Sequence, residues 1–208
     1  ARARTSSSHC SRLPSPAPVL EVQVASGLPA FLVVGLPDKA VGEARERVRA
    51  ALTSIGLALP AKRILINLVP ADLPKEGSHF DLPIALALLA AMGVVPAEEA
   101  GRYAAMGELS LDGRINPVSG VLSAALEASS LGLGLVCPAQ QGEEALWGGD
   151  IAILAAPTLL AVINHFNGMQ PLPSPVFTPR PPAPEQNVLD LADVRGMETG
   201  RRALEIAA

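Results

Sequence analysis

The stretch from Lys62 to Ala91 constrains the fold of this chain more than any other. It reads KRILINLVPADLPKEGSHFDLPIALALLAA, which is an apolar run, a polar loop and a second apolar run. The first run is typical of a buried strand and the second of a buried helix. Four ionisable side chains of the loop lie at the start of that helix: Lys75, Glu76, His79 and Asp81. Unpaired backbone N–H groups and the helix dipole favour ligand binding there, so this loop is a candidate functional site.

Composition limits the kinds of protein this chain can be. Apolar residues make up 49% and charged residues 17%, which is typical of a globular protein. Aromatic residues make up only 3%, so the core must be aliphatic, and this content argues against a nucleic-acid platform built on stacked rings. The net charge of −4 provides no overall attraction to DNA, so any contact with nucleic acid requires a local basic patch.

Metal, secretion and membrane signals are all weak. Cys10 and Cys137 match no metal-binding or redox spacing, and the chain has three His, so we expect no metal site. The N-terminus lacks the apolar stretch of a secretory signal. The apolar run Leu82–Val95 is too short to span a membrane. We therefore expect a cytoplasmic protein without membrane contact.

Hydrophobic periodicity predicts a single two-layer α/β domain, with a mixed sheet and helices packed on it. Strands are expected at residues 19–25, 30–34, 63–69, 133–137 and 151–154, and a strand pair turning at Asp112-Gly113 within 103–118. Helices are expected at residues 39–55, 82–95, 121–131, 141–146 and 158–166. We expect 30–34 to form a hairpin with 19–25, because only a short turn sequence separates them.

Details of the helices follow from the same pattern. The helix over residues 39–55 has one apolar stripe: Val41, Ala44, Val48, Ala51, Leu52 and Ile55. Gly56 occupies the position expected of a C-cap glycine. Asp81 is the candidate N-cap of the next helix, with Pro83 in its first turn.

The chain divides into four parts by composition. Residues 1–18 are rich in Ser and Pro and predict a flexible arm, and residues 19–168 predict the α/β domain. Residues 169–187 are rich in Pro and predict a stiff linker of polyproline character. Residues 188–208 are too few to hold a core of their own, so we expect them to be the start of a second domain.

Several long segments resemble the competence protein ComM family of magnesium-chelatase-like AAA+ ATPases. They are GLPAFLVVGLPD, EARERVRAAL, the segment from Pro60 to Ala91, and the closing DLADVRGMETGRRALEIAA. The similarity extends from about Ser11 to Ala208. It implies that residues 19–168 are similar to the Lon protease domain, a ribosomal-protein-like α/β fold. It also implies that residues 188–208 are the severed start of an AAA+ module.

The resemblance implies a role in the branch migration of DNA during natural transformation. The whole protein would be a homohexamer, so the partners implied are its own AAA+ module, neighbouring subunits and DNA. ATP and Mg²⁺ are implied for the AAA+ module. No G-x-x-x-x-G-K-[ST] phosphate-binding loop occurs in this sequence, so no cofactor is assigned to any residue here.

Lon-type proteases pair a Ser at the start of one helix with a Lys at the start of a later one. PKEGSHFDLPIALAL is similar to the segment with the Ser, whose position corresponds to His79. GELSLDGRINPVSGVL is similar to the segment with the Lys, whose position corresponds to Leu122. Ser78 lies one residue away from the first position, and Lys75 is expected to be solvated and charged. The resemblance therefore implies no catalytic residue, and we expect no enzymatic activity from this chain.

Each residue of the helix-mouth loop also has a structural interpretation. His79 is a candidate general base, ligand or nucleic-acid contact, but packing beside the helix explains it better. Glu76 is explained equally well by the helix dipole, and Asp81 better by capping than by catalysis.

The densest basic group of the chain is the second candidate site: Arg45, Arg47, Arg49, Lys62 and Arg63. It can serve as a DNA-contact face that binds phosphates. Alternatively it is a solvated helix face, paired with Glu43 and Glu46 at helical spacing, and we favour this interpretation.

The function expected is that of a non-catalytic accessory or assembly domain of a ComM-like ATPase acting on DNA. Two alternatives remain open. One is a Lon-like serine peptidase with a rearranged site, and the other is a subunit of a magnesium-chelatase-type ATPase.

Overall fold

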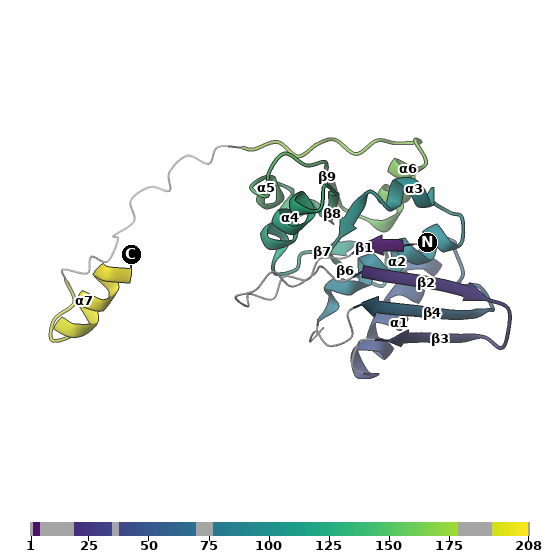
Figure 1. The fold of residues 1–208 in the computed structure, drawn as a ribbon, viewed down its shortest axis with the longest axis horizontal. Coiled ribbons are helices and arrows are strands. Elements are labelled where there is room, and N and C mark those ends of the chain that lie inside the picture. Colours follow the sequence, from purple (N-terminus) through teal and green to yellow (C-terminus); the bar gives the residue numbers. More distant parts are fainter. Residues whose placement is uncertain (1, 5–18, 35–37, 70–76, 179–192, 208) are drawn as a thin grey trace. The chain divides into compact units, whose positions relative to one another are not determined.

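The computed structural model describes residues 2–4, 19–34, 38–69, 77–178 and 193–207. The chain forms two compact units, Ala1–Phe177 and Thr178–Ala208. The first unit contains a mixed sheet with helices packed on it (Figure 1). This confirms the predicted α/β fold with a mixed sheet.

The main sheet has seven strands in the order β3-β4-β2-β1-β5-β8-β9. Their bounds are Arg2–Arg4 (β1), Val19–Ala25 (β2), Ala30–Val34 (β3), Arg63–Val69 (β4), Tyr103–Ala105 (β5), Gly134–Pro138 (β8) and Ile153–Ala156 (β9). A separate two-stranded sheet consists of β6 (Glu108–Leu109) and β7 (Ile115–Asn116).

The predicted hairpin between residues 19–25 and 30–34 is wrong. Strand β4 lies between β2 and β3, antiparallel to β2 and parallel to β3. This central position pairs the backbone of β4 on both edges, whereas a β2–β3 hairpin would leave it at the edge of the sheet. The connection Ser26–Pro29 therefore spans two strand spacings, about 9.5 Å, instead of closing a tight turn.

The N-terminal arm predicted over residues 1–18 contains a strand. Strand β1 pairs antiparallel with β2 and parallel with β5, so it joins the two halves of the sheet. A Ser/Pro-rich composition gave no signal for this strand, because its pairing is with distant segments. Residues 5–18 lie outside the described part of the chain.

Helices and 3₁₀ turns connect the strands of the first unit. Their bounds are Asp38–Ser54 (α1), Ser78–Phe80 (η1), Asp81–Ala91 (α2), Ala97–Ala100 (α3), Val121–Ser130 (α4), Ala139–Gln141 (η2), Gly142–Leu146 (α5) and Leu159–Phe166 (α6). The stripe of α1 is buried at Ala44, Val48, Ala51 and Leu52, as predicted. Gly56 follows this helix with φ +80°, a conformation that favours glycine, which confirms its predicted role.

Helix α2 is the central element of the main core. All residues from Asp81 to Leu89 are buried, so this helix is surrounded by protein on every side. It contacts α1, β2, β5 and β6. The predicted extension to Val95 is not helical, because Gly93 adopts φ +73° and the chain turns there.

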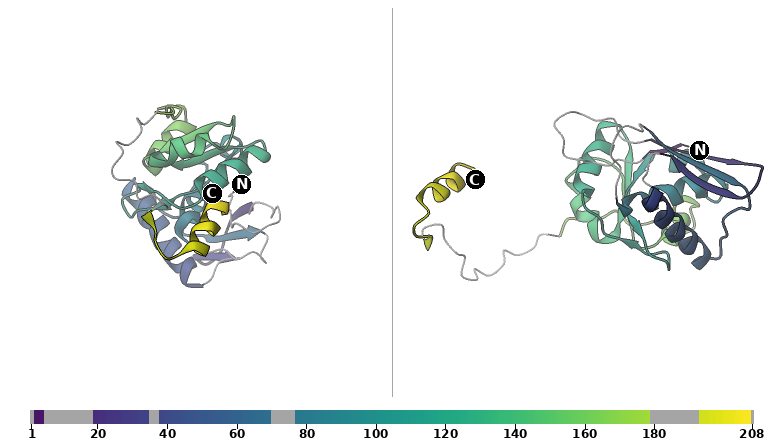
Figure 2. Two further views of the ribbon diagram at one scale, coloured as in Figure 1. Left: turned by 90° about the vertical axis from the view of Figure 1, so that its left-hand side faces the viewer. Right: turned by 90° about the horizontal axis from the view of Figure 1, so that it is seen from below.

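The two halves of the sheet are covered differently (Figures 1 and 2). One face of β2, β3 and β4 packs against α1 and α2, and the outer face exposes Leu32 and Val34. The strands β5, β8 and β9 are buried on both faces. Val136 belongs to the main core with α2 and α6, whereas Leu135 belongs to a second core with α4 and α5. The predicted two-layer arrangement therefore holds for the half of the sheet with β2, β3 and β4. The half with β5, β8 and β9 has three layers, because helices cover both of its faces.

The predicted first strand of the 103–118 pair is divided into β5 and β6. Gly107 lies at the break, where a Cβ would lie 2.8 Å from Cγ2 of Ile115 and 3.2 Å from Cδ2 of Leu82. The close approach of β7 and α2 therefore requires glycine here. The predicted turn at Asp112-Gly113 is confirmed, with Gly113 at φ +82°.

The second unit contains the helix α7, Glu198–Ala207, none of whose residues is buried. Within the described residues, no helix combines the length and the apolar character needed to cross a membrane. The predicted linker is described up to Thr178, and its described residues from Pro171 to Thr178 form no helix or strand.

Candidate functional site

The mouth of α2 is held by backbone hydrogen bonds to the break between β5 and β6. The N–H of Leu82 donates to the carbonyl of Gly107 at 3.1 Å, and the N–H of Gly107 donates to the carbonyl of His79 at 3.2 Å. The N-cap residue is Phe80, and no side chain caps the helix. The predicted capping role of Asp81 is therefore wrong, because its carboxylate is bound elsewhere.

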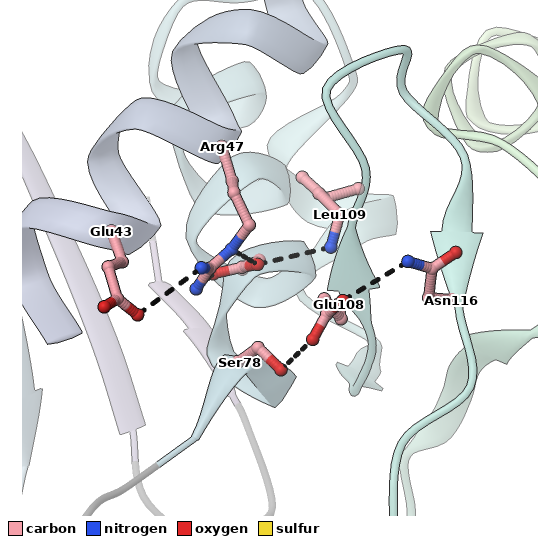
Figure 3. A network of polar contacts seen from close by, with 7 residues as sticks. Glu43, Arg47, Ser78, Glu108, Leu109 and Asn116 are labelled. Atoms are coloured by element: carbon pink, nitrogen blue, oxygen red, sulfur yellow. Dashed lines mark hydrogen bonds and ion pairs between the residues drawn. The ribbon is translucent and has the colours of Figure 1, made fainter.

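Asp81 forms a two-point ion pair with Arg47 of α1 (Figure 3). Nε of Arg47 lies 2.6 Å from Oδ2 of Asp81, and Nη2 lies 3.1 Å from Oδ1. The N–H of Leu109 donates to the same Oδ2 at 3.3 Å. The Asp81 side chain is fully buried and that of Arg47 is 24% exposed. This pair ties α1, α2 and β6 together.

Burial shifts the pKa of the carboxylate in this ion pair. Burial raises the pKa of Asp81 to about 6, even though the bond from Arg47 and its charge favour the ionised carboxylate. The bond to Asp81 raises the pKa of Arg47, which is therefore charged at every relevant pH. Both partners are ionised at neutral pH, and the buried carboxylate depends on Arg47 for compensation.

A second set of contacts lies beside the first, centred on Glu108 of β6. The Ser78 hydroxyl donates to Oε2 of Glu108, and the Asn116 amide donates to Oε1 at 3.3 Å. The bond from Ser78 lowers the pKa of Glu108, and the Asn116 bond and the Arg47 charge act in the same direction. Figure 3 shows the two sets side by side, from Glu43 to Asn116.

A hollow of about 540 Å³ lies next to these contacts. Its lining residues are Gly77, Ser78, His79, Pro117, Val118 and Ser119. The amide of Gln141 holds the backbone of Val118 at 2.9 Å and 2.8 Å, which fixes the far wall of the hollow. The ring of His79 packs on Phe80 with centroids 4.2 Å apart. Lys75 and Glu76, the other predicted residues of this loop, lie outside the described residues.

The basic group is divided by the fold. Arg45, Arg49 and Lys62 line one groove of about 440 Å³ between α1 and strands β3 and β4. Arg47 is removed from this group, because it binds Asp81 and contacts Glu43 at 3.7 Å. Arg63 is exposed at the start of β4.

Comparison with known proteins identifies the family. Residues 20–141, more than half of the chain, match the family described as subunit ChlI of Mg-chelatase. The chain belongs to this family.

Relatives in this Mg-chelatase-like AAA+ family align with most of the chain. The competence protein ComM of Haemophilus influenzae is 41% identical over 197 residues, which cover 93% of this chain and 39% of that protein. YifB of Escherichia coli is 42% identical over 194 residues, which cover 93% of this chain and 38% of YifB. The chain thus spans about two fifths of the length of these relatives. The predicted assignment to the ComM family is confirmed.

The site of this family member lacks the chemistry of a Ser–Lys protease among its described residues. Ser78 bonds a carboxylate, and the lowered pKa of Glu108 makes that carboxylate a weak base for a hydroxyl. Leu122, at the position that the resemblance assigns to the Lys, carries no amine. Lys62 is the one lysine whose side chain is described, and it lines the α1 groove instead of the hollow.

Other nucleophiles and metal ligands are also poorly placed. Burial raises the pKa of the Cys137 thiol to about 12, so it remains protonated and unreactive at neutral pH. In the described part of the chain, no group of three or more His, Cys, Asp or Glu side chains is arranged to hold a metal ion.

Two side-chain contacts at this site were not predicted from the sequence: Arg47 with Asp81, and Ser78 with Glu108. Each joins residues about 30 positions apart, as the separations of 34 and 30 show. No local pattern carries such a pairing. The one available signal was the position of Asp81 directly before an apolar helix, because a carboxylate there must find a partner when the helix is fully buried.

Proposed function

We propose that this chain is a non-catalytic accessory and assembly domain of a ComM-like AAA+ ATPase that acts on DNA. The observation that supports DNA contact is the groove at α1, where Arg45, Arg49 and Lys62 converge in a protein of net charge −4. A local cluster of cations can bind phosphates even when the whole molecule is acidic.

The cations of the groove differ in how far they are neutralised. Arg45 pairs with Glu46 at 3.0 Å, and both side chains are exposed. Neither Arg49 nor Lys62 forms a side-chain ion pair with another described residue. An exposed pair such as Arg45–Glu46 is weak, so a phosphate can replace Glu46 at little cost. The groove thus offers about three positive charges to an extended anion.

In this proposal, the ATP chemistry belongs to a separate AAA+ module. A motor of the AAA+ type would bind ATP and Mg²⁺, and this domain would join neighbouring subunits of a homohexamer or guide DNA toward them. The name of one relative, competence protein ComM, supports a role in competence. The activity we propose for the whole protein is branch migration of DNA during natural transformation. Action on incoming DNA implies a cytoplasmic location.

The test is DNA binding measured by fluorescence anisotropy with forked and single-stranded DNA at several salt concentrations. The variant Arg45→Ala/Arg49→Ala/Lys62→Ala should bind at least about tenfold more weakly. Its slope of log affinity against log salt should be smaller by roughly 2 to 3, since three phosphate contacts are lost.

A charge-matched control separates the groove from overall charge. Arg102→Ala/Arg114→Ala/Arg202→Ala removes three exposed arginines elsewhere and should change affinity much less. Arg47 is left intact in both variants, because its loss would disturb the fold. Equal affinity and equal salt slope for the two variants would remove the groove from the proposal.

A peptidase with a rearranged site is the second candidate, because Ser78 bonds Glu108 beside a hollow. The lowered pKa of Glu108 argues against it, since a strong base is needed to activate a serine hydroxyl. We expect no cleavage of casein or fluorogenic peptides above the level of Ser78→Ala. Turnover that Ser78→Ala abolishes would establish the peptidase. A chelatase role rests on the description of the family alone.

A further inference from the structure

The segment that follows α6 is packed along the first unit. In Figure 1 it runs from α6 toward α5. Its first hydrogen bonds are from the N–H groups of Met169 and Gln170 to the carbonyl of Asn164, at 2.9 Å and 3.2 Å. We call residues Met169–Phe177 the strap.

The middle of the strap is anchored at two points. The N–H of Leu172 donates to Nδ1 of His165 at 2.9 Å, and the Leu172 side chain packs against the main core. Pro175 lies over Gly142, where a Cβ would lie 2.9 Å from Cβ of Pro175 and 2.7 Å from Cβ of Ala155. The absence of a side chain at Gly142 therefore gives the strap room to approach α5.

The two half-buried residues of the strap lie three positions apart. Leu172 and Pro175 are half-buried, whereas Pro173, Ser174 and Val176 are exposed. Three residues per turn is the repeat of the polyproline II helix, which presents every third side chain to the surface beneath. Proline-rich segments bind protein surfaces in this way, commonly against aromatic rings.

The outer end of the strap is an aromatic contact. The ring of Phe177 meets Trp147, the residue after α5, edge to face with centroids 5.8 Å apart and planes at 86°. Trp147 remains 69% exposed and Phe177 53% exposed. This contact is thus far more open to solvent than Leu172, so the outer end can leave the surface while the inner anchor remains.

We propose that the surface of α5 and α6 is a binding site for the chain's own proline-rich strap, and that the Trp147–Phe177 contact is a latch on its outer end. The second unit begins at Thr178, directly after the latch. Opening of the latch, followed by release of the Pro175 contact with Gly142, frees the five residues Pro173–Phe177 and lengthens the tether of the second unit by about 15 Å at 3.1 Å per residue. The latch therefore sets how far the second unit can reach.

The first test is chymotrypsin cleavage after Phe177 in the full chain, followed by mass spectrometry. Trp147→Ala should increase the rate of this cleavage about threefold to tenfold, in line with the strength of an aromatic pair. Trp147→Phe keeps a ring at the position and should restore most of the protection. Leu126→Ala removes another exposed apolar side chain, from α4, and should leave the rate unchanged.

The second test uses hydrogen exchange, and its main comparison is made within the wild-type chain. In the wild-type chain the Leu172 amide should exchange at least tenfold more slowly than the Thr178 amide, and Trp147→Ala should leave the Leu172 rate unchanged. Small-angle scattering should then show a larger radius of gyration for Trp147→Ala than for wild type. Equal cleavage rates in all four proteins, or fast exchange at Leu172 in the wild type, would overturn the proposal.

Discussion

The Arg47–Asp81 ion pair binds a fully buried carboxylate to a partly exposed guanidinium. The charge of Asp81 is compensated by Arg47 and by the N–H of Leu109. Because burial removes water from the carboxylate, the loss of Arg47 leaves a charge that the protein cannot solvate.

Arg47→Ala should therefore lower the free energy of unfolding by about 3 kcal/mol, measured by urea denaturation at pH 7. Arg45→Ala is the matched control on the same helix, because Arg45 forms only an exposed pair with Glu46. The control should lose less than about 1 kcal/mol. Equal losses in the two variants would show that the buried pair contributes no more than a surface pair.

The pH dependence of stability tests the raised pKa of Asp81. The folded-state pKa of about 6 exceeds the ordinary 3.8, so the folded state binds more protons between these values. The stabilising contribution of Asp81 to the free energy of unfolding is fully present below its unfolded-state pKa. It is lost as pH rises through about 6. Glu108 has a lowered pKa and acts below 4.5, so it does not contribute from pH 5 to 7, and a comparison with Asp81→Asn isolates the contribution of Asp81 in that range.

Between pH 5 and pH 7 the wild type should lose about 1 kcal/mol of unfolding free energy more than Asp81→Asn does. Urea denaturation at the two pH values measures the difference. Asp150→Asn alters an exposed carboxylate and should keep the wild-type decline. An identical decline in Asp81→Asn and wild type would mean that Asp81 titrates at its ordinary pKa.

At the scale of elements, the junction of α2 with β6 and β7 depends on the glycine at the break. Gly107→Ala should destabilise the protein by about 2 kcal/mol, because its Cβ would lie 2.8 Å from Cγ2 of Ile115. Gly42→Ala in α1 is the control, since nothing lies within 4 Å of its Cβ, and it should stabilise by about 0.5 kcal/mol. Thermal unfolding of both variants would show shifts of opposite sign, and a stabilised Gly107→Ala would contradict the close packing.

At the scale of the whole molecule, the two cores share the strands β5, β8 and β9. Val136 points into the main core and Leu135 into the second, so neither core can unfold without disturbing the same strands. The first unit should therefore unfold in one cooperative step.

Leu135→Ala tests this coupling and should cost about 3 kcal/mol. Its urea transition should be the same by far-ultraviolet circular dichroism, which reports all helices, and by the fluorescence of Trp147, the one tryptophan. Trp147 follows α5, whose residues Ala145 and Leu146 belong to the second core. A fluorescence transition that precedes the dichroism transition would show that the second core unfolds separately.

Much of this architecture could be read from local pattern. Periodicity located the strand over residues 63–69 and the stripe of α1, and glycine positions located the turns at Gly56 and Gly113. These features depend on neighbours within a few positions, which the sequence displays directly. The hairpin of residues 19–25 with 30–34 failed, because strand order depends on which distant strand pairs with each edge.

The sequence alone was sufficient to identify an aliphatic α/β protein of the ComM family without a G-x-x-x-x-G-K-[ST] loop in the printed residues. Three contacts could not be predicted before folding was known: Arg47 with Asp81, Ser78 with Glu108, and Phe177 of the proline-rich segment with Trp147. The difference lies in how far apart in the sequence the interacting groups are. Local backbone preferences act over a few residues, whereas ion pairs and ring contacts form between groups that only folding brings together.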